Sequence, residues 1–372
     1  MKKIILTALL PLLAVFSAVA QTAAAITVGN AIGYRQERHL YEKDGHLSLV
    51  SLDLEWPRLL AGDVQQPLQD YLTTFFFGTS APSPGEAWAS YIRPMGNEVG
   101  KMPEGEGVKV SYYDLKLQNL WLETGRYVSF MASVEERNDT AVVARRLACF
   151  TYDLINRAIL TQQDVFNQRR TWESYDYRYS FEQAIGQTMV VDPTEKGEVR
   201  IDSVPGQFAL MGSEVRLSIP GTPGKDHYAL LPVSFLDELF SKSFRNWRRM
   251  PARNEISGQP MTVVYGQQAA KVCMQPDSAA AFPGGNRALS DFIGQYMTLP
   301  PAVLPSGRVM ASFLIDDAGA VQCLTALPTT ASYDGRLCRA VVDALRVMPR
   351  WKPAQVGGKP VWSHIVFPLN IN

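Results

Sequence analysis

The last quarter of the chain begins with Phe282-Pro283-Gly284-Gly285-Asn286 and ends with Val361-Trp362-Ser363-His364-Ile365-Val366-Phe367-Pro368-Leu369-Asn370-Ile371. After the glycine pair, apolar residues fall at i, i+3, i+4, i+7 and i+8, the spacing of one helix face: Leu289, Phe292, Ile293, Tyr296 and Met297. This spacing predicts a helix over 286–297. Pro300 and Pro301 end it, because proline lacks the N–H that a continuing helix needs.

Beyond these prolines the pattern predicts five further segments. They are a strand, a tight turn, a return strand, a helix and a terminal strand, at 309–315, 316–319, 321–327, 335–348 and 361–371. Asp334 is placed to cap the second helix, and Pro349 stops it. The predicted order is αββαβ, so we expect a small α+β domain at 282–372.

The same region resembles the TonB C-terminal domain family. The resemblance is carried by residues that recur in the family's order: Phe282-Pro283-Gly284-Gly285, Met348-Pro349-Arg350-Trp351-Lys352-Pro353, Gly357-Gly358-Lys359-Pro360-Val361 and the apolar terminal strand. In that family the domain receives an extended peptide of an outer-membrane receptor against its sheet edge, through backbone hydrogen bonds. The resemblance therefore implies a receptor peptide or other envelope protein as partner. By position, the binding residues would be Trp362, His364, Val366 and Pro368. The competing interpretation is a closing strand that binds no receptor.

Four cysteines are present, at positions 149, 273, 323 and 338. Cys323 falls on the predicted return strand and Cys338 on the following helix. A disulfide between them would close a short loop and contribute on the order of 3 kcal/mol in an oxidising compartment. Many TonB C-terminal relatives carry a cysteine on each of these two elements. The alternative is two small buried apolar residues.

The N-terminus predicts export. Lys2 and Lys3 precede an apolar run, and Ala18-Val19-Ala20 is the small-residue ending at which a signal peptidase would leave Gln21 first. We therefore expect a signal peptide at 1–20 and a periplasmic or otherwise exported protein. The alternative is an uncleaved inner-membrane anchor, and membrane contact is expected only through this segment.

Residues 21–250 are predicted to form a separate extracytoplasmic α+β domain, joined to the C-terminal domain by a linker at 251–281. Val50, Leu52 and Leu54 alternate with polar residues as in a half-buried strand, and 67–77 has the spacing of a helix.

One stretch of this domain carries a second family resemblance. Cys149-Phe150-Thr151-Tyr152-Asp153-Leu154, followed by Leu160-Thr161-Gln162-Gln163-Asp164-Val165-Phe166, resembles the extracytoplasmic domain of lysozyme-sensing anti-sigma factors and of proteins associated with peptidoglycan deacetylases. This implies an alternative function: an envelope sensor or inhibitor that binds a lysozyme-like protein or a cell-wall glycan. The alternating aromatic residues Tyr175, Tyr177, Tyr179 and Phe181 would form either a face that stacks on sugars or an ordinary core face.

Composition and motifs argue against several other classes of protein. The charges of the 36 basic and 36 acidic residues cancel, and removing Lys2 and Lys3 leaves a net charge of 34 − 36 = −2. A protein that binds nucleic acid usually has an excess of basic residues, which this chain lacks. We find no Cys-x-x-Cys or His-Glu-x-x-His spacing for a metal and no Gly-x-Ser-x-Gly elbow. Gly357-Gly358-Lys359 lacks the other residues of a phosphate loop. We therefore expect no catalytic residue, metal or cofactor, and a non-enzymatic protein.

Overall fold

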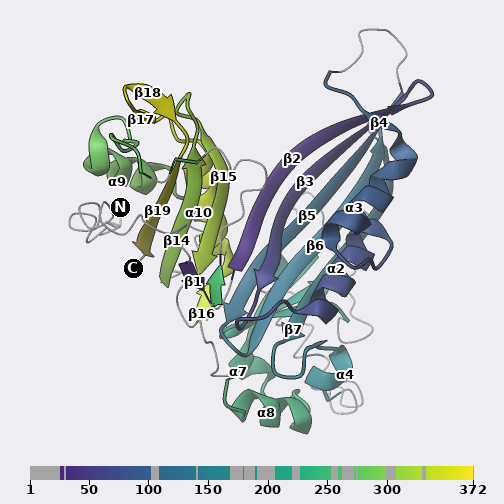
Figure 1. Ribbon diagram of the computed structural model, residues 1–372. Helices are drawn as coiled ribbons and strands as arrows, with labels where there is room; N and C mark the ends of the chain where they lie inside the picture. The colour runs from purple at the N-terminus through teal and green to yellow at the C-terminus, as the bar shows by residue number, and fades with distance from the viewer. Residues whose placement is uncertain are drawn as a thin grey trace. The chain divides into compact units, whose positions relative to one another are not determined.

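The computed structural model describes residues 26–28, 31–101, 109–139, 141–167, 179, 189–190, 206–219, 227–252, 259–261, 272–273, 275–298, 307–328 and 332–371. These residues form two compact units (Figure 1). The N-terminal unit comprises 36–54 and 65–254, and the C-terminal unit comprises the described parts of 1–35, 55–64 and 255–372. The units are thus discontinuous in sequence, whereas the domains expected from the sequence were continuous. The predicted signal peptide, 1–20, lies outside the described residues.

The N-terminal unit is built on a long-stranded sheet. Its strands, in spatial order, are β2 (Ala31–Lys43), β3 (His46–Leu59), β5 (Lys109–Glu123), β6 (Tyr127–Asn138), β7 (Ala141–Asp153) and β8 (Ala158–Ile159), with the short β4 (Asn97–Glu98) on β2. Strands β3 and β5 run parallel, while β5, β6 and β7 are antiparallel neighbours. The first residues of β2 and the last of β3 belong to the C-terminal unit.

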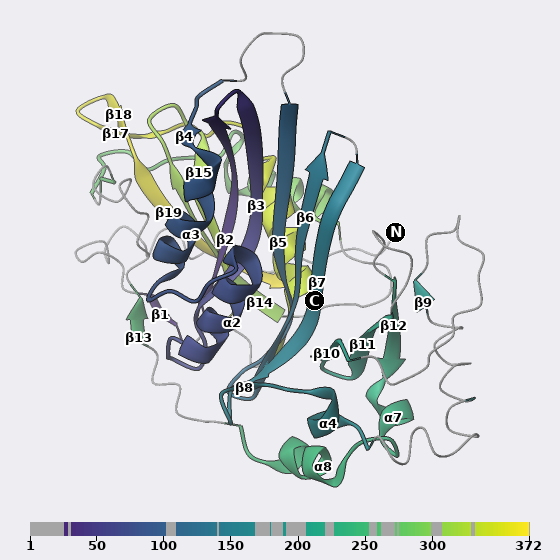
Figure 2. The same cartoon turned by 90° about the vertical axis from the view of Figure 1, so that its right-hand side faces the viewer.

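Two helices and a 3₁₀ turn lie over one face of this sheet: α2 (Gln66–Phe77), α3 (Pro84–Ile92) and η1 (Arg93–Met95) (Figures 1 and 2). The ring of Tyr71 on α2 lies 4.7 Å from that of Phe150 on β7, which fixes the covered face. Apolar side chains of α2 and of the strand face are fully or almost fully buried: Leu68, Leu72, Phe76, Val50, Leu52 and Leu54. The expected alternation of β3 and the expected helix at 67–77 are confirmed.

A smaller sheet completes the N-terminal unit, with strand order β10 (Phe208–Met211), β11 (Glu214–Ile219), β12 (His227–Pro232) and β9 (Met189–Val190). Helices α4 (Gln162–Val165), α7 (Val233–Leu236) and α8 (Lys242–Arg249) accompany it. Phe166, Phe208, Phe240, Phe244, Trp247 and Tyr127 are the aromatic residues buried in their shared core. The Thr161 hydroxyl accepts from Asp164 N, and the Asp164 carboxylate accepts from Thr161 N, so a capping box starts α4.

The described part of the C-terminal unit contains two helices and the neighbouring strands β19, β14 and β15, in that order, and Ala326 of β15 pairs with Ile32 at the start of β2. Its elements are α9 (Gly285–Tyr296), β14 (Gly307–Ile315), β15 (Val321–Pro328), β16 (Ser332–Asp334), α10 (Gly335–Arg346), β17 (Ala354–Val356), β18 (Lys359–Val361) and β19 (Ser363–Ile371). Asp334 caps α10 by accepting from Arg336 N. The expected α+β class is confirmed, and the predicted helices and strands of 282–372 occur in the predicted order. The hairpin of β17 and β18 was not expected.

The described parts of 251–281, the region expected to be a linker, take part in strand pairing. Strand β13 (Gln259–Met261) pairs with β1 (Ile26–Val28). Val272, Ser278 and Ala281 form β-bridges to Trp362, Gln355 and Lys352, respectively. These bridges explain why 255–281 belongs to the C-terminal unit. Over the described residues, no helix is both long and apolar enough to cross a membrane.

Candidate functional site

The predicted peptide-binding strand is the outermost strand of its sheet. Strand β19 pairs with β14 along its whole length, from Ser363 opposite Ile315 to Ile371 opposite Gly307. Among the strands that the structure describes, β14 is the only ladder partner of β19. The main chain of β19 therefore has one side hydrogen-bonded to β14 and an outer side.

A hydrogen bond beside β19 shows which residues face outward. Cys273 N donates to Trp362 O at 2.8 Å, so the carbonyl of Trp362 points away from β14. Because the two sides alternate along an antiparallel strand, the main chains of His364, Val366, Pro368 and Asn370 also point outward. Pro368 fits this position, since proline has no N–H to donate to a neighbouring strand.

The side chains of His364, Val366 and Pro368 share one face of β19, and Trp362, the residue before this strand, continues the same alternation. Phe367, Leu369 and Ile371 are buried on the opposite face, where the Phe367 ring lies 5.8 Å from that of Phe313. Trp362, His364, Val366 and Pro368 are half-buried. The structure thus brings the predicted residues together on one face and at one edge. The main-chain carbonyl of Trp362 already accepts a hydrogen bond from the N–H of Cys273.

His364 is neutral at physiological pH. Its Nε2 lies 2.9 Å from the hydroxyl of Ser312, a fully buried residue of β14. Burial lowers the pKa of His364 to about 4, because a charged imidazole would lose its hydration. An uncharged ring is compatible with a half-buried, largely apolar face.

The predicted disulfide stays a prediction. Cys338 lies buried on α10, and burial, together with the nearby Glu55, raises the pKa of its thiol. The side chain of Cys323 lies outside the described part of the structure. Cys149 is buried and Cys273 is half-buried. Within the described ranges, no group of three or more His, Cys, Asp or Glu side chains is placed to hold a metal ion.

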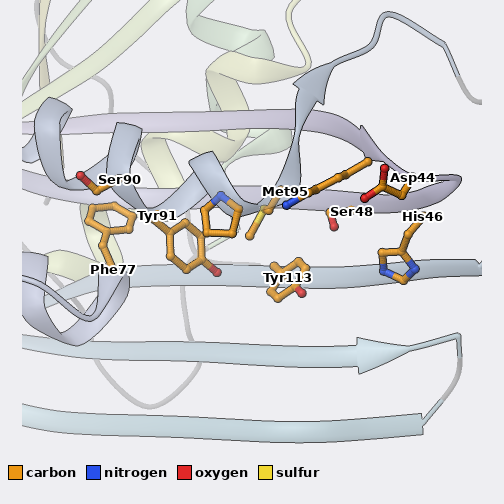
Figure 3. A pocket seen from close by; sticks show the side chains of 10 residues that line it. Asp44, His46, Ser48, Phe77, Ser90, Tyr91, Met95 and Tyr113 are labelled. Carbon is orange, nitrogen blue, oxygen red and sulfur yellow. The ribbon is translucent and has the colours of Figure 1, made fainter.

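A second candidate site, which the sequence did not reveal, is a cavity of about 670 Å³ in the N-terminal unit (Figure 3). Its lining comes from the β2–β3 turn, two strands and the overlying helical segments: Lys43, Asp44, His46, Ser48, Phe77, Ser90, Tyr91, Pro94, Met95 and Tyr113. The cavity lies on the helix-covered face, because Tyr91 of α3 contacts Tyr113 of β5 with ring centroids 6.5 Å apart.

The cavity forms where this sheet face changes from apolar to polar. Register places three rows of side chains across β3, β5 and β6: Leu52–Leu115–Val134, then Val50–Tyr113–Glu136, then Ser48–Ser111–Asn138. The first row is buried core, and the last row carries only polar side chains. The helices thus cover an apolar floor at one end and a polar floor at the other.

A chain of hydrogen bonds organises the polar row. Ser111 Oγ donates its one hydrogen to Asn138 Oδ1 at 2.7 Å. The 3.0 Å contact between His46 Nε2 and Ser111 Oγ therefore requires the imidazole to donate. His46 thus does not accept a proton from Ser111, the reverse of the arrangement that activates a serine nucleophile.

The wall beside η1 depends on a close backbone approach. Gly96 has φ +94°, and a Cβ there would collide with the carbonyl oxygen of Glu42 on β2. Glycine therefore lets the chain pass directly from η1 to β4 against β2, which places Pro94 and Met95 over the strands.

Three strands carry a sequence signal for this cavity. Along one face of each of β3, β5 and β6, apolar side chains are followed by polar ones. Only the strand registers show that these three changes lie side by side. The aromatic run at 175–181 lies outside the described residues except for Tyr179, which is exposed.

No family model matches the chain, and no curated protein does so. The solved structure of a DUF3298 family member from Bacteroides fragilis is 12% identical, with a TM-score of 0.38, and the match covers 58% of this chain and 96% of that one. A DUF3298 family protein from Pseudomonas aeruginosa is 13% identical, with a TM-score of 0.34, and the match covers 59% and 97%. These scores are low, so the functional interpretation rests on residues of this chain.

Proposed function

We propose that this chain is a non-enzymatic binding protein of the cell envelope, exported to the periplasm, whose C-terminal unit receives an extended peptide against β19. The observation that carries the proposal is the position of β19 at the end of its sheet with outward-facing main-chain groups. The resemblance of 282–372 to the TonB C-terminal domain supports it, because strand addition is that family's mode of recognition.

The geometry limits how the peptide pairs. The carbonyl of Trp362 already accepts from Cys273, and Pro368 has a carbonyl but no N–H. His364 and Val366, between them, each provide both a donor and an acceptor. Pairing is therefore short and confined to His364 and Val366, and each hydrogen bond adds only about 0.5–1.5 kcal/mol. We expect weak, reversible binding in which side chains contribute the selectivity.

Selectivity would come from the face shared by Trp362, Val366 and Pro368. Successive residues of a paired peptide alternate between the two sheet faces, so every second residue meets these apolar side chains. A suitable peptide is extended and alternates apolar with polar residues.

The test uses the full mature chain and ten-residue peptides from the periplasm-facing N-termini of outer-membrane receptors of the same organism. Binding is measured by fluorescence anisotropy. Val366→Pro removes the outward N–H and should abolish binding. Val366→Thr keeps the main chain and the β-branched shape, so it should retain most of the affinity. Arg287→Ala, on the exposed start of α9, should have no effect.

Circular dichroism must show that the proline variant remains folded. Two results would overturn the proposal: equal binding by Val366→Pro and the unchanged protein, or no binding by any receptor peptide.

A further inference from the structure

The cavity of the N-terminal unit has the features of a ligand site. Its volume of about 670 Å³ lies in the range of roughly 300–1,000 Å³ that is usual for small-molecule pockets. It combines aromatic rings with several polar side chains, and it is distinct from the strand edge that would bind a peptide.

One side of the cavity is an aromatic wall held in place by its own packing. Tyr91 contacts Phe77 at 5.5 Å and Trp88 at 6.0 Å, measured between ring centroids. Tyr91 also meets Tyr113 nearly edge to face, at an interplanar angle of 88°. Figure 3 shows Tyr91 coming from the helical segment and Tyr113 from the strand beneath it. Rings fixed in this way present a rigid surface to a flat ligand at little entropic cost.

The other side of the cavity supplies hydrogen-bonding groups. Ser48 and His46 lie on β3, and Ser90 reaches the cavity from α3. His46 donates through Nε2 to Ser111, which leaves Nδ1 as the second hydrogen-bonding atom of the ring. Burial raises the pKa of Tyr113, and Glu136 raises it further, so the phenol stays protonated. Donors and acceptors therefore occur together.

The charge of the lining selects among ligand classes. Among the described residues that line it, only Lys43 and Asp44 are charged, and their charges cancel. A phosphate or carboxylate ligand would need an excess of basic groups, which this lining lacks. A hydrocarbon chain would remove Ser48, His46 and Ser90 from water without replacing their hydrogen bonds. The lining matches a neutral ligand that has hydroxyl groups around its rim and an apolar face.

We infer that this cavity binds a neutral saccharide, with a pyranose face stacked on the ring of Tyr91 or Tyr113 and its hydroxyls bonded to His46, Ser48 and Ser90. Alternating axial C–H groups give a sugar ring an apolar face, and its hydroxyls both donate and accept. The cavity offers a partner to each part. This inference does not depend on peptide binding at β19.

The experiment titrates the full mature protein with two neutral probes, chitotetraose and maltotetraose, by isothermal calorimetry. We expect saturable binding of at least one of them. Tyr113→Ala should weaken that binding by about tenfold or more, because it removes a stacking ring from the cavity. Val366→Pro should leave it unchanged.

Tyr112→Ala is the matched control, because Tyr112 is adjacent on β5 and its side chain lies on the opposite sheet face. It should bind the probe as the unchanged protein does, and thermal unfolding of both variants checks that each is folded. His46→Ala provides a second variant from another strand, and it should weaken binding while leaving the aromatic wall in place.

Three results would overturn the inference. One is that neither saccharide gives a binding heat up to about 10 mM, a concentration at which even a site with a Kd of about 1 mM is nearly filled. Another is an equal loss from Tyr112→Ala and Tyr113→Ala. The last is saturable binding of laurate that depends on Tyr113 while neither saccharide binds, which would identify a lipid site.

Discussion

Strand β19 and the cavity of the N-terminal unit would recognise ligands through different parts of the chain. The edge of β19 offers main-chain groups at alternate positions, and most side-chain substitutions leave those groups intact. The cavity offers side chains such as Tyr113 and His46, whose removal changes the site directly. A proline in β19 should therefore disable the strand edge, whereas an alanine in place of a lining side chain should disable the cavity. Each site thus has its own diagnostic substitution.

The two sites also differ in what holds them in place. Strand β19 is positioned by its ladder with β14, and the β14–β15 turn abuts the chain at Trp351, whose N–H donates to Gly319 O at 2.8 Å. The cavity is positioned by ring contacts between α2, α3 and β5. Substitutions that damage one of these supports test whether the sites are independent.

The largest effect is expected from Gly319→Ala. Gly319 has φ +80°, and a Cβ there would collide with the carbonyl oxygen of Trp351, so both the turn and its neighbour must move. We expect the free energy of unfolding of the C-terminal unit to fall by about 3 kcal/mol or more. Hydrogen exchange should show faster opening of β14 and β19.

Gly294→Ala is the control for this substitution, because Gly294 lies within α9 with open space around it. Alanine there should stabilise the helix by roughly 0.5–1 kcal/mol. If the comparison holds, Gly319→Ala abolishes peptide binding and leaves saccharide binding intact. A parallel loss of both would show that the sites are coupled.

The next effect concerns the predicted bridge between Cys323 and Cys338. Oxidised protein should lose about 3 kcal/mol of stability on Cys323→Ala, because a 15-residue loop is no longer closed in the unfolded chain. Reduced protein should lose much less. Non-reducing peptide mapping should recover the linked pair, and free thiols at both positions in protein taken from the periplasm would refute the bridge.

A smaller effect is expected from pH through His364. Burial places the folded-state pKa at about 4, below the ordinary value of 6.5. Between these values the unfolded chain binds a proton that the folded chain does not, so stability is full above pH 6.5 and falls as the pH decreases toward 4. We expect a loss of about 1–2 kcal/mol between pH 7.5 and pH 5.

Urea unfolding at the two pH values measures this loss. His364→Gln keeps a polar side chain that does not titrate, and it should remove most of the pH dependence assigned to the C-terminal unit. An unchanged dependence in this variant would show that other groups cause it.

The smallest effect lies in the N-terminal unit, at the capping box of α4. Thr161→Ala removes the hydroxyl that accepts from Asp164 N, at an expected cost of about 1 kcal/mol. Thr161→Ser keeps a hydroxyl and should cost much less. Thermal unfolding measures both variants, and neither binding site should change. Weaker saccharide binding by Thr161→Ala would contradict the view that rings and strands alone position the cavity.

The fold of the C-terminal unit was largely predictable because its signals are local. The helical spacing of Leu289 and Ile293, the turn before Gly319 and the cap at Asp334 each depend on residues within a few positions of one another. Strand β19 lies at the end of its sheet, and the role of its residues in peptide binding stays a prediction. The hairpin of β17 and β18 is three residues a side and has too little periodicity to be seen in advance.

By itself, the sequence determined the α+β class, the order of helices and strands near the C-terminus and which face of β3 is apolar. Only the tertiary structure decided that 26–35 and 55–64 belong with the C-terminal unit, and that polar residues of β3, β5 and β6 meet under α3. The physical reason is that periodicity is set by the geometry of one element, whereas strand partners and registers depend on which distant segments bury their apolar faces together.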